Sequence, residues 1–230
     1  MKKLLLTIAV MAMSASMFAQ ADSTKVQSDK GQSTKDTIEG FVFTTVDSVA
    51  ITPVKDQNRS STCWAFSTLG YLESELLRMG KGVYDLSEMF VVSKTMMDRA
   101  TYQVRMYHEA SFSPGGSAYD VIYCMKHYGL VPQAAMPGIQ YGWSAADSLP
   151  VHNELDAVAS GYVNGLKKMK KLTPVWKKGL QAIYDTYLGA CPEEFEYNGK
   201  TYTPKTFVQM LGLNADDYVS LTSYTHHPFY

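Results

Sequence analysis

The sequence predicts an α+β fold in which helices dominate. In several stretches, apolar residues recur at steps of three and four, which places them on one face of an α-helix. Alternating aromatic residues flank an Asn-Gly pair at 198–199, a pattern typical of a β-hairpin. Helices and strands do not alternate in the rhythm of βαβ units. With 230 residues, 46% of them hydrophobic, the chain is long enough to bury one sizeable core.

The N-terminus predicts an export signal. Two lysines follow the initial methionine, residues 4–18 are apolar or small, and residues 19–21 supply an Ala-x-Ala cleavage site. A membrane anchor is the alternative interpretation, but the apolar stretch is short for a membrane-spanning helix. We therefore expect a signal peptide over residues 1–21 and a flexible polar leader over 22–40. The mature chain is expected to be exported, to the periplasm or outside the cell, with no membrane as a partner.

Two short extended segments and one long helix are expected to open the ordered part of the chain. Residues 41–46 are rich in β-prone side chains, and residues 51–54 contain Pro53, which marks an edge strand or a lead-in. Residues 63–78 give the strongest helical pattern, and Gly80 ends it. The apolar residues on one face of this helix are Ala65, Leu69, Leu72, Leu76 and Met79.

Four further helices are expected before the hairpin. Ser87 is the predicted N-cap of the first, with Glu88 in its first turn. The others are predicted over residues 117–128, 155–171 and 174–188, the last with a proline at its start.

Three elements are expected in the last part of the chain. The hairpin covers residues 195–202 around the Asn-Gly turn. Thr203 and Pro204 open a short helix that runs to Met210, and residues 218–222 predict a strand.

Charge and cysteine content exclude several classes of partner and site. The formal charge of −1 gives no electrostatic reason to expect nucleic acid or an anionic membrane as a partner. The chain has no Cys-x-x-Cys pair, no His-Glu-x-x-His motif and no carboxylate cluster, so we expect no metal and no cofactor. Three cysteines in an exported protein leave at least one thiol unpaired. Cys124 and Cys191 are interpreted as structural, and a disulfide between them is left open.

The segment around Cys63 has the features of a nucleophile site. The thiolate is the reactive form of cysteine, and the start of a helix favours negative charge because its N–H groups are unpaired. Cys63 stands at the predicted start of the long helix. Acyl transfer also needs donors for the developing oxyanion. The backbone N–H of Cys63 and the side-chain amide of Gln57, six positions earlier, are the candidates.

This segment, residues 57–67, resembles the active-site segment of papain-like cysteine peptidases. The glutamine spacing, the Cys-Trp pair, the following Ala-Phe-Ser and the helix all agree with that family. The resemblance implies that Cys63 is the nucleophile, that Gln57 is the oxyanion donor and that Trp64 lies at the substrate cleft. The alternative is that Cys63 is a buried structural cysteine.

Two positions differ from the papain pattern. Ser60 occupies the place of a cysteine that papain uses in a disulfide, so that bridge is not expected here. Ser61 occupies the place of a glycine, which adds a Cβ and a hydroxyl beside the cleft. The second difference bears on catalytic efficiency more than on the fold.

Other segments extend the resemblance over about residues 41–230. Residues 85–88 resemble the start of the family's second helix, and Gly115 and Gly116 resemble its Gly-Gly cleft wall, where substrate backbone approaches closely. The alternative for the two glycines is an ordinary turn.

Residues 128–132, the closing residues 218–230 and a helical insertion at about 142–215 are similar to the bleomycin hydrolase / aminopeptidase C branch. That branch implies aminopeptidase action on peptide substrates and a homo-oligomer, a hexamer in relatives. Its members are mostly intracellular, so an exported version is a departure.

The catalytic base is not evident in this sequence. The family takes a histidine and an asparagine from a later, strand-rich half. The five histidines are His108, His127, His152, His226 and His227. The first three are interpreted as surface or structural residues, and the last two lack the family's strand context and precede Pro228.

We therefore expect residues 41–230 to be the N-terminal, mainly helical part of a papain-like domain, with the β-rich half, its histidine and its asparagine absent. The predicted function is peptide hydrolysis through an acyl-enzyme at Cys63. The alternative is an inactive fragment or a peptide-binding module.

Overall fold

The structure is a computed structural model that describes residues 44–106, 112–142 and 149–221. Its helices and its hairpin all belong to one compact unit that begins at Asp47. The predicted signal peptide and leader, together with His108, His226 and His227, lie outside the described residues.

Helix α2, Cys63–Arg78, has the bounds predicted from the sequence. Its buried face includes Ala65, Leu69, Leu72 and Leu76, the residues that the periodicity placed together. The chain leaves the helix at Gly80, whose φ of +69° is easily adopted only by glycine. Local sequence is sufficient to set this helix because its pattern, its start and its stop all agree.

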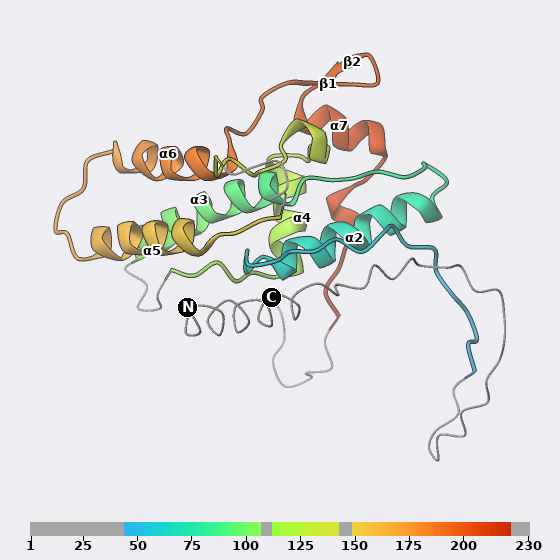
Figure 1. Cartoon of the computed structure of the whole chain (residues 1–230), viewed down its shortest axis with the longest axis horizontal. Coiled ribbons are helices and arrows are strands. Elements are labelled where there is room, and N and C mark those ends of the chain that lie inside the picture. The colour runs from blue at the N-terminus through green and yellow to red at the C-terminus, as the bar shows by residue number, and fades with distance from the viewer. Residues whose placement is uncertain (1–43, 107–111, 143–148, 222–230) are drawn as a thin grey trace, which may run out of the picture. The chain divides into compact units, whose positions relative to one another are not determined.

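Helix α3, Glu88–Met106, lies at the centre of the unit and packs against α2, α4, α5 and α6 (Figure 1). Its predicted N-cap is confirmed, because the Ser87 hydroxyl accepts a hydrogen bond from the Phe90 N–H at 3.2 Å. The same hydroxyl donates to the Met136 carbonyl at 2.6 Å, so the cap also ties down a later loop.

Helix α4, Ala118–His127, is also close to its prediction, with Ser117 and Asp120 forming a capping box. It ends before Gly129, which has a φ of +92°. A Cβ at Gly129 would lie 2.3 Å from the Pro204 carbonyl carbon, so glycine also permits close packing at the start of α7, Pro204–Leu211.

Helices α5, Asn153–Lys167, and α6, Trp176–Leu188, pack against each other and against α3 (Figure 1). Both were predicted, but α5 is shifted towards the N-terminus and α6 begins two residues later than expected. The intervening loop is well exposed, with Met169 at 53% and Val175 at 63%. Without burial there, the lysine-rich end of the predicted helix does not continue the helical path.

The hairpin consists of β1, Phe195–Tyr197, and β2, Lys200–Tyr202, which pair antiparallel. Asn198 and Gly199 have φ values of +51° and +72°, as a two-residue hairpin turn requires. The hairpin packs on α7, where the Phe207 ring makes edge-on contacts with three hairpin aromatics. Two 3₁₀ helices, Gln133–Ala135 and Ala215–Asp217, complete the described elements.

Two predicted strands, and the edge-strand alternative for residues 51–54, are wrong wherever the structure describes them. Residues 44–46, 51–54 and 218–221 have no strand structure. Their apolar side chains are exposed, Val54 at 91% and Leu221 at 93%, and no neighbouring strand completes a hydrogen-bonded ladder. The described part of the chain is therefore mostly helical, with six α-helices and one two-stranded sheet, in place of the broader α+β fold predicted.

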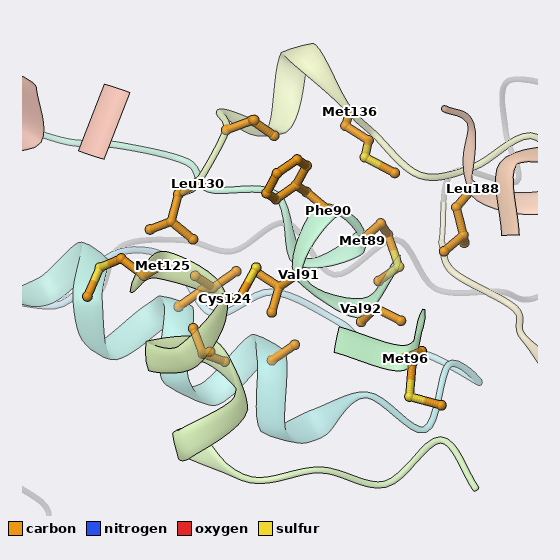
Figure 2. Close-up of a cluster of buried hydrophobic side chains, with 14 of the residues drawn as sticks. Met89, Phe90, Val91, Val92, Met96, Cys124, Met125, Leu130, Met136 and Leu188 are labelled. Atoms are coloured by element: carbon orange, nitrogen blue, oxygen red, sulfur yellow. The ribbon is translucent and has the colours of Figure 1, made fainter. Parts of the chain in front are cut away.

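The core is built around α3 (Figure 2). Its buried side chains meet those of α4 and of the loops that follow it, with Leu188 from α6 at one edge. The residues labelled in this cluster are Met89, Phe90, Val91, Val92, Met96, Cys124, Met125, Leu130, Met136 and Leu188. Of the helices that the structure describes, none combines the length and apolar character needed to cross a membrane.

Candidate active site

Cys63 is the first residue of α2, and its side chain is exposed. The preceding residue, Thr62, does not cap the helix, because its hydroxyl is paired with the buried Ser60 hydroxyl at 2.5 Å. The first N–H groups of α2 therefore have no side-chain cap. The structure thus confirms that Cys63 stands at an uncapped helix start, as the sequence predicted.

Gln57 and Cys63 line the same cavity, which has a volume of about 700 Å³. A backbone hydrogen bond from the Ser60 N–H to the Gln57 carbonyl, at 3.2 Å, closes the turn between them. Gln57 Oε1 is buried and has no hydrogen-bond partner among the described residues. The apolar residues of the cavity wall are Val49, Ile51, Pro53, Val54, Phe66 and Tyr71. The structure thus brings the two predicted catalytic residues to one open cavity.

Ser61 has a backbone conformation that glycine adopts most easily. Its φ is +57°, in the left-handed region, where a side chain with a Cβ costs about 1 kcal/mol or more. The turn that presents Cys63 therefore carries local strain at the position where papain-like peptidases usually have glycine.

A buried ionic cluster holds the segment that leads to Gln57. Lys55 Nζ lies 2.8 Å from carboxylate oxygens of both Glu73 on α2 and Glu88 on α3, and 2.6 Å from the exposed Asp85. Glu73 also accepts from the Thr52 hydroxyl at 2.8 Å. Sequence reasoning missed this cluster, because three of its members are far apart along the chain.

The pKa values in the cluster follow from burial and pairing. Burial alone would lower the pKa of Lys55, but Glu88, Asp85 and Glu73 together raise it above its ordinary value. Burial raises the pKa of Glu88 in spite of the opposing effect of Lys55. A charged lysine shared between two buried carboxylates is therefore the anchor of this segment.

His152, the residue before α5, supports the turn that precedes Cys63. Its backbone N–H donates to the Arg59 carbonyl at 3.0 Å, next to a parallel bridge between Arg59 and Val151. The side chain is buried, and burial lowers its pKa to about 4, against the smaller opposite effect of a hydrogen bond to the Ser60 backbone. This histidine is therefore neutral near pH 7, as a structural residue would be.

The described histidines do not supply a base for Cys63. His152 is buried, and the His127 ring stacks on Tyr123 with centroids 4.2 Å apart. Neither lines the cavity that contains Cys63 and Gln57.

The Gly-Gly wall lies directly against Trp64. The indole Nε1 donates to the Pro114 carbonyl at 3.0 Å. A Cβ at Gly116 would lie 2.5 Å from the Trp64 ring, so only glycine fits at that distance. Gly115 has open space at its Cβ position, with nothing within 4 Å. Trp64 itself is only 5% exposed, so its contact is with the wall.

The remaining cysteines are free thiols, so the disulfide left open from the sequence is not formed. Burial raises the pKa of both Cys124 and Cys191, which keeps these thiols protonated and unreactive. Across the described residues there is no group of three or more His, Cys, Asp or Glu side chains arranged to hold a metal.

The comparison with protein families agrees with this geometry. Residues 42–134, which contain Gln57, Cys63 and the Gly-Gly wall, match the model of the papain family cysteine proteases. The part of the chain that contains the candidate site is therefore papain-like. The resemblance predicted from the nucleophile segment is thereby confirmed.

Several relatives share shorter or longer parts of the chain. A cysteine proteinase of Trypanosoma brucei brucei is 31% identical over 116 residues, which are 48% of this chain and 26% of that protein. Aminopeptidase G of Lactobacillus delbrueckii subsp. lactis is 27% identical over 216 residues, 76% of this chain and 48% of the relative. Cysteine proteinase A of Leishmania mexicana is 40% identical over 52 residues, which are 23% of this chain and 15% of that protein.

The match to aminopeptidase G agrees with the predicted bleomycin hydrolase-like branch. The chain spans about half the length of aminopeptidase G and less of the other two relatives. Among solved structures, PepW from Lactobacillus rhamnosis HN001 has 21% sequence identity and a TM-score of 0.49, over 71% of this chain and 45% of that one.

Proposed function

We propose that the whole protein is a cysteine peptidase in which Cys63 is the nucleophile and Gln57 a donor to the oxyanion. One observation supports this most directly: the exposed thiol at the uncapped start of α2 shares a cavity with Gln57. The match of residues 42–134 to the papain family supports the same chemistry. The cavity is open enough for a peptide, and its apolar wall suits the side chains of a peptide substrate.

In the proposed reaction, the Cys63 sulfur bonds to the carbonyl carbon of the peptide, and the π electrons of the carbonyl move onto its oxygen. The Gln57 amide and the Cys63 backbone N–H donate to that oxyanion. The intermediate collapses as the carbon–nitrogen bond breaks, and the departing amine takes a proton from an imidazolium. Water, deprotonated by the same imidazole, then hydrolyses the thioester and restores the thiolate.

The histidine of this scheme is proposed to come from a second half of the whole protein. Neither described histidine lines the Cys63 cavity, and the chain spans 48% of aminopeptidase G. An asparagine in that half would orient the imidazole, as the family resemblance implies.

Aminopeptidase action on peptides is the finer proposal, and it draws support from the 27% identity to aminopeptidase G. Release of single N-terminal residues from unblocked peptides, with N-acetylated peptides left intact, would support it. Cleavage inside a blocked peptide would instead indicate an endopeptidase.

The decisive experiment is selective labelling of the full-length protein with a peptidyl chloromethyl ketone, followed by mapping of the modified residue. We expect the label on Cys63 alone, because Cys124 is buried, Cys191 is partly buried, and both thiols have raised pKa values. Cys63→Ala should abolish both labelling and hydrolysis while the fold is retained, and Cys191→Ala is the matched control. Full hydrolysis by Cys63→Ala would exclude the proposed nucleophile.

A second candidate function is peptide binding without catalysis. It is favoured by the lack of a histidine among the described residues of the Cys63 cavity. The coding sequence beyond codon 230 separates the two: a continuing frame with a strand-borne histidine and a later asparagine supports the enzyme, and a stop codon supports the binding module.

Export and assembly of the whole protein are also proposals. The N-terminal signal pattern supports export, which fractionation of cells into cytoplasm, periplasm and medium would test. A homo-oligomer such as a hexamer is proposed from the branch resemblance, and light scattering of the full-length protein would give its mass.

A further inference from the structure

Arg99 of α3 connects the residue after the nucleophile to the Gly-Gly wall. Its guanidinium carbon lies 5.6 Å from the centroid of the Trp64 ring, a cation–π contact. One of its terminal nitrogens, Nη1, donates to the Gly115 carbonyl oxygen. One side chain therefore touches both the Cys-Trp pair and the wall.

A third contact fixes the direction of the guanidinium. Arg99 Nη2 lies 2.6 Å from Asp120 Oδ2, and Nε donates to Asp120 Oδ1 at 3.3 Å. Asp120 is itself held by the capping box at the start of α4, where it accepts from the Ser117 N–H at 2.8 Å. The Asp120 carboxylate thus holds one edge of the planar guanidinium. The Nη1 atom of Arg99 remains available to donate to the Gly115 carbonyl.

Of the two glycines in the wall, Gly116 is packed against Trp64 and Gly115 has open space beside it. Gly116 lies so close to Trp64 that a Cβ would come within 2.5 Å of the ring. Gly115 has open space beside it, so packing does not explain its glycine. Its carbonyl accepts from Arg99, and its open face leaves room for another polypeptide backbone to approach.

We propose that Arg99 is a positioning residue for the peptide substrate. It holds Gly115 and Gly116 at the depth and angle at which their backbone groups pair with substrate backbone, and it does so without touching substrate. This inference rests on the proposed peptidase function, because it assigns the wall to the substrate of Cys63.

An ion pair with a purely structural role is the alternative, and the geometry argues against it. The Arg99 and Asp120 side chains are 28% and 17% exposed, and partly exposed pairs contribute little to stability. A pair with only that role would not need the additional carbonyl and indole contacts. Three differently directed contacts require a planar guanidinium, which lysine cannot replace.

The test compares two rates of Cys63 alkylation in the full-length protein. Iodoacetamide reports the reactivity of the thiol alone, and a dipeptidyl chloromethyl ketone reports that reactivity together with backbone binding at the wall. In Arg99→Ala we expect the ratio of peptidyl to iodoacetamide rate to fall about tenfold, the effect of one misplaced backbone hydrogen bond. The iodoacetamide rate should remain within about twofold of the parent value.

Arg105→Ala is the matched control, since Arg105 is an exposed arginine in the last turn of the same helix. Its rate ratio should equal that of the parent protein. A parent-like ratio in a folded Arg99→Ala variant would overturn the inference. No preference for the peptidyl reagent in the parent protein would instead count against the proposed function.

Arg99→Lys tests the positioning role of Arg99 if Arg99→Ala does not fold. It keeps the positive charge over Trp64, but it cannot satisfy Asp120 and the Gly115 carbonyl together. A folded lysine variant whose ratio is reduced about threefold or more supports the positioning role. A folded lysine variant with the parent ratio contradicts it.

Discussion

The Lys55 ammonium lies 2.8 Å from the Glu73 carboxylate, and this contact ties the chain leading to Gln57 onto α2. Glu73 is almost wholly buried, with a side chain 1% exposed, and its other partners are the Thr52 hydroxyl and the Leu86 N–H. Gln57 is two residues beyond Lys55. The position of the proposed oxyanion donor therefore depends on a partly buried ion pair two residues earlier in the same segment.

Glu73→Gln is expected to reduce both stability and activity. The substitution keeps the shape but leaves the Lys55 charge without one of its two buried partners, a loss of about 3 kcal/mol in the free energy of unfolding. In the full-length protein, kcat should fall as Gln57 loses its fixed position. Urea denaturation and steady-state kinetics measure the two effects. Glu75→Gln, in an exposed pair with Arg78 on the same helix, should leave both almost unchanged.

Gln57→Ala is expected to lower kcat about 100-fold with little change in KM, because one oxyanion donor is lost only in the transition state. Gln57→Glu is the matched variant, since it preserves the length of the side chain but removes the N–H donor. We expect an equal or larger loss of kcat in Gln57→Glu. An effect confined to KM in both variants would mean that Gln57 only contacts substrate.

Ser61→Gly is expected to stabilise the protein. The φ of +57° strains serine but not glycine, and this gain exceeds the extra freedom of glycine in the unfolded chain, for a net of about 0.5 kcal/mol. Turnover by the full-length protein should also rise, because a Cβ and a hydroxyl beside Cys63 are removed. Asn58→Gly is the comparison, at a φ of +46° where asparagine is already tolerated. Lower stability in Ser61→Gly would show that the hydroxyl makes a favourable contact that outweighs the strain.

Local patterns predicted the helices well, and long-range contacts explain what they missed. Helix α2 was predictable because periodicity, start and stop all lie within Cys63–Arg78. An edge strand at residues 51–54, one of the two alternatives expected there, depended on a partner that the described part of the chain does not provide. The ion pairs of Lys55 and the contacts of Arg99 join segments 18 or more and 16 or more residues apart, which no single-sequence pattern reveals.

The candidate site likewise has features that the local sequence predicts and features that it does not. Cys63 and Gln57 could be found because the spacing between them follows from one short turn and one helix start. The strain at Ser61 could be suspected only from its place in the family pattern. The burial of His152 could not be predicted, because it results from packing of the start of α5 beside the turn that precedes Cys63.

Stability is expected to fall on acidification because of His152. Its pKa in the folded protein is about 4, below the ordinary value of 6.5, so between these values the unfolded chain binds more protons. The contribution is present above pH 6.5 and is lost as pH falls towards 4, by about 2 kcal/mol between pH 7.5 and 5. Asp156 acts oppositely, since burial raises its pKa to about 6 and favours the folded state as it protonates.

The difference between the parent and His152→Asn isolates the histidine from Asp156. Urea midpoints at pH 7.5 and pH 5 should differ less in His152→Asn than in the parent protein. His127→Asn, at an exposed position on α4, is the surface-histidine variant measured alongside it. Equal pH dependence in the parent and His152→Asn would mean that His152 is not buried as a neutral group.

The last prediction concerns the chain by itself. Residues 22–230 should hydrolyse no aminoacyl substrate at a measurable rate, because neither described histidine lines the cavity of Cys63 and Gln57. The start of a helix cannot donate a proton to the departing amine, whereas an imidazolium can. Exposed apolar side chains beside the cavity, such as Ile51 at 67% and Val54 at 91%, also predict aggregation of this chain.

Hydrolysis of aminoacyl fluorogenic substrates by purified residues 22–230 tests this directly, with Cys63→Ala as the blank. If the chain is active, the His226→Ala and His227→Ala variants show whether one of these two histidines is the base. Robust turnover that either variant removes would make a tail histidine the base and would overturn the proposal of a second half. If the chain is inactive and a longer gene product with a downstream histidine is active, the base belongs to that second half. The helical part would then supply the nucleophile, the oxyanion donor and the Gly-Gly wall. The turn at Ser60 precedes the nucleophile, the ion pair of Lys55 with Glu73 holds the segment of the oxyanion donor, and the hydrogen bond from Arg99 to Gly115 holds the wall.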